Sequence, residues 1–149
     1  MHIYDGPIKR EEVGQSVLFS ATSNGSFAGS ARLDLMERPE LFGPKPQCYF
    51  ANLSVSEEFR GNGLGGKLLD SALTEAKSRG YRYVLLAVDE DKEIAQHIYN
   101  ERGFRILPGI RDGYDRMVMV LDLENRRPGF AAAHMGALAR DLARVGVEA

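Results

Sequence analysis

The sequence predicts one mixed α/β domain that carries an additional helix at its C-terminal end. Its length, 149 residues, is the usual size of a single domain. Its segments follow the order strand, strand, strand, helix, strand, helix, strand, strand, which is typical of a mixed α/β fold. No internal repeat or low-complexity linker divides the chain. We therefore expect a core over residues 16–123 and the extra helix over about 128–145.

A tight hairpin is predicted near the N-terminus, after the polar residues 1–15, which show no clear pattern. Asn24-Gly25 is a strong hairpin signal, because both central positions of a type I′ turn need positive φ. Apolar residues flank this pair, and they alternate with polar residues in the second half of the segment that follows. We expect antiparallel strands at residues 16–22 and 27–36.

A third strand is expected after a loop. Residues 37–47 contain three prolines and a glycine, which disfavour regular structure. Residues 48–55 form the strand, and they begin with Cys48, the only cysteine in the chain. A lone cysteine cannot form an intrachain disulfide, and this one lies in an apolar run. We expect a small buried residue rather than a nucleophile.

Two helices and three further strands complete the pattern. Apolar residues recur at helical spacing over residues 64–79, and Gly80 suits the left-handed position after the last turn. The later elements are expected as a strand at 83–88, a helix at 90–102, strands at 104–107 and 116–123, and the C-terminal helix. The apolar stripe of that last helix would pack either on its own domain or on a second copy in a homodimer.

Composition and charge argue against several functions. The 19 basic and 21 acidic residues give a net charge of −2, whereas a general nucleic-acid binder would be basic. No apolar run approaches the roughly 18 residues that span a membrane, and the N-terminus does not resemble a signal peptide. We expect a cytoplasmic protein with no nucleic-acid or membrane partner.

A glycine-rich loop between a predicted strand and the long helix carries the main functional signal. It runs from Gly61 to Lys67 with the sequence Gly-Asn-Gly-Leu-Gly-Gly-Lys. Glycines let backbone N–H groups come close to a phosphate, and the N-terminus of a helix adds positive potential. We expect a phosphate-binding site here, although the loop nearly matches three different patterns.

Two of these patterns fit only in part. Gly61, Gly63 and Gly66 match the dinucleotide fingerprint, whose first glycine should end the strand directly. Polar residues 56–60 intervene here, although Asp89 lies near the place of the ribose-binding acid. The P-loop pattern fits up to its last position, which is a leucine instead of the Ser or Thr that ligates magnesium. The upstream hairpin also suits neither pattern, since both belong to larger parallel sheets.

The third pattern begins before the loop. Leu53-x-Val55 is followed by a short acidic turn and then by Arg60-x-x-Gly63-x-Gly65. This segment resembles the acetyl-CoA signature of the GNAT (GCN5-related N-acetyltransferase) superfamily. A second block, Ala95-x-x-Ile98-Tyr99-x-x-x-Gly103-Phe104, resembles the helix of that superfamily that carries a tyrosine and ends at Gly-Phe. The two blocks extend the resemblance over residues 47–107.

This resemblance implies a fold and an activity. The fold would be a mostly antiparallel sheet with a V-shaped split between two central strands. The activity would be transfer of an acetyl group from acetyl-CoA, as co-substrate and without a metal, to a primary amine. The acceptor could be a small-molecule amine or an amine of a peptide or protein, and the sequence does not distinguish these. A non-catalytic module that binds and senses acetyl-CoA is the alternative.

The resemblance also implies site residues. Tyr99 would donate a proton to the departing thiolate, and backbone N–H groups between Asn52 and Ser54 are candidates for stabilising the oxyanion. The pantetheine arm would lie along the strand near Leu53 and Val55. The pyrophosphate would be held by backbone N–H groups of the loop, which comprises Arg60, Gly61, Asn62, Gly63, Leu64, Gly65, Gly66 and Lys67.

Three departures from the family pattern affect these expectations. Lys92 stands where many members have an asparagine that contacts the pantetheine arm, so that contact would be altered. Gln47 stands where some members have a glutamate base, and we expect His97, which lies beside the second block, to be a surface residue. The two helices that usually separate the first and second strands would be truncated or absent, which would leave the acceptor side open.

Overall fold

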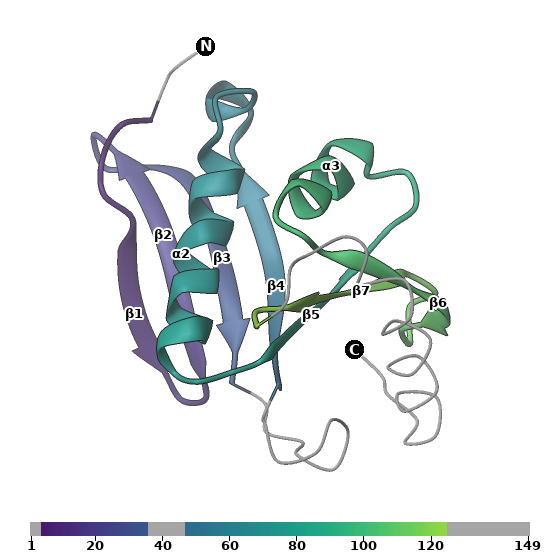
Figure 1. Ribbon diagram of the computed structural model, residues 1–149. Coiled ribbons are helices and arrows are strands. Elements are labelled where there is room, and N and C mark those ends of the chain that lie inside the picture. Colours follow the sequence, from purple (N-terminus) through teal and green to yellow (C-terminus); the bar gives the residue numbers. More distant parts are fainter. Residues whose placement is uncertain (1–3, 36–46, 125–149) are drawn as a thin grey trace.

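The computed structural model describes residues 4–35 and 47–124, which form one sheet with two helices (Figure 1). The strands lie side by side in the order β1-β2-β3-β4-β5-β7-β6, and every neighbouring pair is antiparallel except β4 and β5. The elements are β1 (Lys9–Val13), β2 (Ser16–Ser23), β3 (Ser26–Asp34), β4 (Gln47–Val55), the 3₁₀-helix η1 (Glu57–Phe59), α2 (Leu64–Ser78), β5 (Tyr83–Val88), α3 (Glu93–Glu101), β6 (Arg105–Arg111) and β7 (Met117–Asp122).

The predicted fold class is confirmed, and so are most of the predicted elements. The strand at residues 83–88 has the predicted bounds, and the long helix ends one residue earlier than expected. The second helix begins at Glu93, because residues 90–92 form a turn instead of its first helical turn. The predicted C-terminal helix at 128–145 lies outside the described residues, as does most of the predicted loop at 37–47.

Strand β1 was not predicted, because none of its five residues is buried and its sequence shows no alternation. It pairs with β2 across a two-residue connection, Gly14-Gln15. No helix separates the first two described strands. The face of the sheet away from α2 is therefore polar along β2 and β3, where Ser20 and Arg32 are only partly buried.

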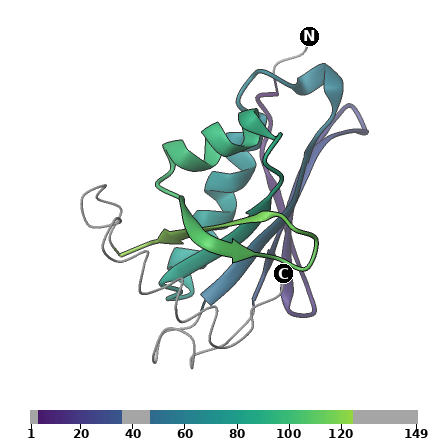
Figure 2. The ribbon, with the colours of Figure 1, turned by 90° about the vertical axis from the view of Figure 1, so that its right-hand side faces the viewer.

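Both helices lie on the same side of the sheet, where the core is (Figure 2). Helix α2 connects β4 to the parallel strand β5 and packs across β2, β3 and β4. It presents an apolar stripe to them, and burying each leucine of such a stripe contributes about 1.5–3 kcal/mol. The buried residues of α2 are Leu64, Gly65, Gly66, Leu68, Leu69, Ala72, Leu73 and Ala76.

The two central strands separate after a short parallel pairing. Strands β4 and β5 pair only from Gln47–Tyr83 to Tyr49–Leu85, at the beginning of each strand. Beyond Tyr49 and Leu85 the two halves of the sheet turn away from each other, and α3 lies beside the opening (Figure 1). The predicted V-shaped split is confirmed. A mostly antiparallel sheet also contradicts the dinucleotide and P-loop patterns, which belong to parallel sheets.

Candidate functional site

The glycine loop forms a concave turn of backbone at the start of α2. Gly61 and Gly63 have φ angles of 80° and 83°, which residues with a side chain rarely adopt. Gly63 is the N-cap of α2, and the first helical hydrogen bond runs from the Lys67 N–H to its carbonyl at 3.0 Å. The N–H groups of the first turn therefore have no acceptor within the helix. A Cβ atom on Gly63 would meet no heavy atom within 4 Å, so the space beside this backbone is open.

Two cations next to this loop hold its surroundings in place. Arg60 donates from Nε to the carbonyl oxygen of Val55, at 2.9 Å, and thereby links the loop to the end of β4. Lys67 donates from Nζ to the carbonyl oxygen of Tyr4, at 3.1 Å, which fixes the N-terminal segment over the helix. Asn62 donates its side-chain amide to the Arg60 carbonyl at 3.2 Å. These contacts give the loop a defined shape while both positive charges stay close to it.

The next two glycines pack against other elements instead of facing open space. A Cβ atom on Gly65 would contact Ile98, Val55 and Leu53 at 3.6–3.9 Å, which are ordinary van der Waals distances. Leu53 and Val55 therefore face α2 and α3. Gly66 faces α3, where the side chain of Arg102 leaves no room for a Cβ atom.

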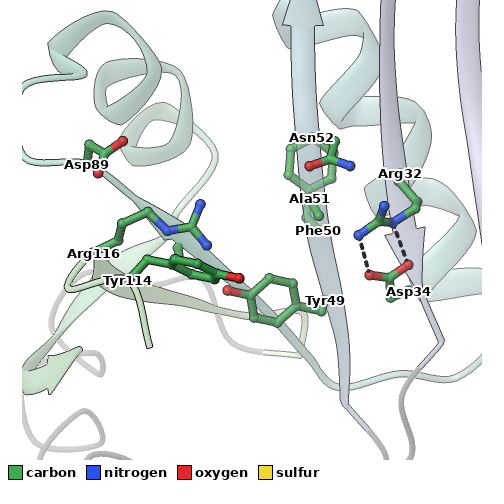
Figure 3. A pocket seen from close by; sticks show the side chains of 10 residues that line it. Arg32, Asp34, Tyr49, Phe50, Ala51, Asn52, Asp89, Tyr114 and Arg116 are labelled. Carbon is green, nitrogen blue, oxygen red and sulfur yellow. Dashed lines mark hydrogen bonds and ion pairs between the residues drawn. The ribbon is translucent and has the colours of Figure 1, made fainter. Parts of the chain in front are cut away.

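A β-bulge in β4 sets which side chains face each side of the split. Asn52 has a φ of 57°, and the register with β3 shifts between Ser30 and Arg32. One extra residue in a strand reverses the alternation of side chains beyond it. As a result Phe50 and Leu53 both face the helices, although they are three residues apart, whereas Tyr49 faces the opposite side (Figure 3).

Tyr99 lies on α3 beside the split, on the helix side. Only 6% of its surface is exposed, and its ring packs against Phe50 and Phe104 at centroid distances of 6.3 and 5.8 Å. Burial raises the pKa of the hydroxyl to about 12, so the group keeps its proton at neutral pH. Within residues 4–35 and 47–124 the hydroxyl has no hydrogen-bond partner. At neutral pH Tyr99 is therefore a neutral phenol that can donate a hydrogen bond.

A pocket of about 640 Å³ opens on the other side of the split (Figure 3). Small residues, Ala51 on β4 and Ala87 on β5, lie where the two strands separate. No pattern in the sequence indicated this pocket, because its residues come from four separate parts of the chain. They are Arg32, Asp34, Tyr49, Phe50, Ala51, Asn52, Ala87, Asp89, Tyr114 and Arg116.

The sequence also singled out four residues outside the loop. Cys48 is buried, and burial raises the pKa of its thiol, so the expectation of an inert cysteine is confirmed. Gln47 is also buried, and its Oε1 atom has no partner among the described residues. His97 is confirmed as a surface residue, since 74% of its side chain is exposed. Lys92 is the exposed N-cap of α3 and makes no side-chain capping bond.

The described part of the chain contains no group of three or more histidines, cysteines, aspartates or glutamates arranged to hold a metal ion. None of its helices is both long enough and apolar enough to cross a membrane.

Comparison with known proteins assigns this chain to a family. Residues 3–104 match the Acetyltransferase (GNAT) family, and the chain belongs to this family. A curated relative, N-alpha-acetyltransferase 30 of Schizosaccharomyces pombe, is 32% identical over 86 residues. That match spans 58% of this chain and 55% of the relative, so the chain matches only about half the length of that protein.

Solved structures share the fold at lower identity. An IAA acetyltransferase from Bacillus cereus ATCC 14579 is 24% identical with a TM-score of 0.62, and the match covers 73% of this chain and 79% of that one. A GNAT family acetyltransferase from Elizabethkingia anophelis with acetyl-CoA bound is 21% identical with a TM-score of 0.61, over 73% of this chain and 77% of that one. At these identities the likeness establishes the fold.

Proposed function

We propose that the chain is an acetyl-CoA-dependent N-acetyltransferase that acetylates a primary amine. One observation carries the proposal: the glycine turn and the β4–β5 split adjoin each other on the helix side, and the split opens into the pocket on the other side. A thioester bound from the helix side and an amine bound in the pocket would thus meet at the split. The fold shared with an acetyltransferase that was solved with acetyl-CoA bound supports this arrangement.

The residues present fit a coenzyme A moiety. The open space beside Gly63 would admit the pyrophosphate, and backbone N–H groups between Arg60 and Lys67 would bind it. Beyond Tyr49, the edge of β4 that faces β5 has no strand partner. The pantetheine arm would bind along this edge near Leu53 and Val55, and Lys92 would stand at the start of α3 beside it.

Acetyl-CoA would supply an acetyl group activated as a thioester. An alkyl ammonium with a pKa near ~10 must lose a proton before its nitrogen can attack. A carboxylate in the pocket, such as Asp89, or a water bound there would accept that proton. As the C–N bond forms and the C–S bond breaks, Tyr99 would protonate the sulfur and later recover its proton from solvent. Backbone N–H groups between Asn52 and Ser54 would stabilise charge on the acetyl oxygen.

Release of free coenzyme A thiol from acetyl-CoA, measured with a panel of amines, tests the proposal. Thiol release that depends on the amine, together with a mass increase of one acetyl group on that amine, is the expected result. The amines should include alkylamines, polyamines, amino acids, short peptides and a lysine-containing protein, because the acceptor class is open.

A non-catalytic acetyl-CoA-binding module is the second candidate. The observation in its favour is Gln47, a buried amide at the position where some relatives carry a glutamate base, because an amide cannot accept the proton. Acetyl-CoA binding without thiol release for any amine in the panel would favour this second function. Failure to bind acetyl-CoA would contradict both candidates.

A further inference from the structure

One wall of the pocket presents hydrogen-bond donors that have no acceptor. The Tyr49 hydroxyl is buried and has no hydrogen-bond partner among the described residues. It points away from β4 and toward the side of the pocket formed by the segment between β6 and β7 (Figure 3). Burial also raises the pKa of this phenol above its ordinary value of 10, so that it remains a donor at neutral pH. A buried hydroxyl without a partner is unfavourable, so its position calls for an explanation.

Arg116 is the second donor on this wall, and its direction is set by a buried carboxylate. Asp112 accepts three hydrogen bonds: from the backbone N–H groups of Tyr114 and Arg116, at 2.9 and 2.8 Å, and from Arg116 Nε, at 2.6 Å. The Asp112 side chain is completely buried, whereas a third of the Arg116 side chain is exposed. Only Nε of the guanidinium is bonded within the described structure. The two terminal nitrogen atoms remain available to a ligand.

A carboxylate, that of Asp89, stands at the end of the pocket beside the open split, and its charge acts on Arg116. Asp89 follows directly after β5, where the split is open, and its carboxylate forms no ion pair with any described residue. It lies across the opening from Asn52, the bulged residue of β4 (Figure 3). A cationic amine would be attracted to this end, which is also where the proposed reaction takes place. The pocket thus offers a carboxylate for an amine at the split and, next to it, donors for an oxygen atom.

We propose that Tyr49 and Arg116 bind a carboxylate or carbonyl oxygen of the acceptor, a few bonds away from the amine that is acetylated. The acceptor is then an amino-acyl compound, either a free amino acid or the N-terminal residue of a peptide, and not a simple alkylamine. Both sources present the same chemistry, an amine next to an oxygen that accepts hydrogen bonds. This inference rests on the proposed function, and it names the substrate class of the same site.

The experiment compares sets of acceptors that differ in the carbonyl or carboxyl group attached to the α-carbon. Each set contains an amino acid, its amide, a dipeptide that begins with it, and the amine left by its decarboxylation. With wild-type protein we expect kcat/KM to be at least about 10-fold higher for the oxygen-bearing acceptors than for the decarboxylated amine. A preference for the free acid would indicate a carboxylate ligand. Equal or better use of the amide and dipeptide would indicate a carbonyl oxygen.

Tyr49→Phe tests the residue itself, because it removes only the hydroxyl. It should lower kcat/KM about 10-fold for oxygen-bearing acceptors, leave the decarboxylated amine unaffected and leave the affinity for acetyl-CoA unchanged. Because it removes a buried donor that has no partner, it should not lower the melting temperature. Tyr83→Phe is the matched control, since Tyr83 is a buried tyrosine at the closed end of the split and outside the pocket. Tyr83→Phe should not change the preference for oxygen-bearing acceptors over the decarboxylated amine.

Three outcomes would overturn the inference: equal use of the decarboxylated amine by wild type, an equal loss for all acceptors in Tyr49→Phe, or a clear fall in the melting temperature of that variant. If no acceptor releases thiol, the proposed function fails. Binding of the acceptors then still tests whether Tyr49 and Arg116 form the oxygen-binding subsite. The protein saturated with coenzyme A is then titrated with each set of acceptors. Tighter binding of the oxygen-bearing compounds that is lost in Tyr49→Phe supports the subsite, and its absence contradicts it.

Discussion

The guanidinium group of Arg102 lies directly against Gly66, where a Cβ atom would come within 2.3 Å of Nη2. The same group binds Asp70, with Nε 2.9 Å from one carboxylate oxygen and Nη2 3.3 Å from the other. Arg102 caps α3, and Asp70 lies on α2, so this contact joins the two helices next to the glycine turn. A side chain at position 66 would therefore displace the Arg102 guanidinium, although the backbone there lies in an ordinary helix.

Gly65→Ala and Gly66→Ala form a matched pair of substitutions that tests this contact. Both replace a glycine in the first turn of α2, where alanine favours the helix by up to about 1 kcal/mol. Gly65→Ala adds only ordinary contacts, so it should be neutral or stabilising. Gly66→Ala must displace Arg102, so it should be less stable than Gly65→Ala by about 1 kcal/mol. Urea unfolding of both variants measures the difference.

Asp70→Asn supplies the control for this pair. It should destabilise the wild type more than it destabilises Gly66→Ala, because the ion pair is already lost in the glycine variant. Equal effects of Asp70→Asn in both backgrounds would show that Arg102 and Gly66 are not coupled.

The glycine turn is tested by acetyl-CoA binding to Gly63→Val. In the wild type, acetyl-CoA at 100 times its Kd should stabilise the fold by about 2.7 kcal/mol, or raise the melting temperature by about 5–10 °C. Gly63→Val should abolish this rise, because a branched side chain would fill the open space beside the turn. NADH and ATP should stabilise the wild type much less than acetyl-CoA does.

Gly80→Val is the matched control, since Gly80 lies just beyond the other end of α2 with a φ of 82° and open space around it. Both variants should lose about 1–2 kcal/mol of stability from the left-handed backbone conformation. Only Gly63→Val should lose the response to acetyl-CoA. An undiminished response in a folded Gly63→Val protein would mean that the turn does not bind the pyrophosphate.

Tyr99→Phe tests the proposed proton donor. It removes the hydroxyl and keeps the ring that packs on Phe50 and Phe104, so kcat should fall by roughly 10- to 1000-fold. The Kd for acetyl-CoA and the melting temperature should change little, because the bound thioester needs no proton. Because burial raises the pKa of Tyr99 to about 12, this residue should not cause a fall in kcat between pH 7 and 10. An unchanged kcat with chemistry rate-limiting would limit Tyr99 to a packing role.

Glu75→Gln should remove a pH-dependent contribution to stability. The carboxylate accepts hydrogen bonds from Arg10 Nε at 2.5 Å and from Arg79 Nε at 2.7 Å, and these bonds lower its pKa to about 2. A lowered folded-state pKa stabilises the fold above the ordinary value of 4.5, and this stabilisation is lost as the pH falls from 4.5 to 2.

At pH 7 the melting temperature of Glu75→Gln should therefore be about 2–4 °C below that of the wild type, and the gap should close near pH 2. Glu57→Gln, which alters an acid without an ion pair among the described residues, serves as the control. A gap that persists unchanged down to pH 2 would contradict the assigned role of the carboxylate.

Most of the local structure could be predicted from the sequence, because neighbouring residues encode it. Asn24-Gly25 specifies a turn through positive φ, and the leucines of α2 specify a helix through their spacing. The glycine turn was also recognisable, because Gly61 and Gly63 adopt conformations that few other residues tolerate. Tyr99 was predicted as the proton donor because the residues around it resemble a family block. The structure buries Tyr99 beside the split.

The pocket, in contrast, was decided only by the tertiary structure. Tyr49, Asp89 and Arg116 lie on separate segments, and no spacing along the chain indicates that they share a cavity. Their meeting depends on where β4 and β5 stop pairing and on the bulge at Asn52, which reverses the side chains beyond it. Strand register and separation arise from long-range pairing and packing, whereas turn and helix signals arise from adjacent residues. The chain alone therefore predicted a phosphate-binding turn, and only the assembled sheet brought together the residues of the proposed acceptor pocket.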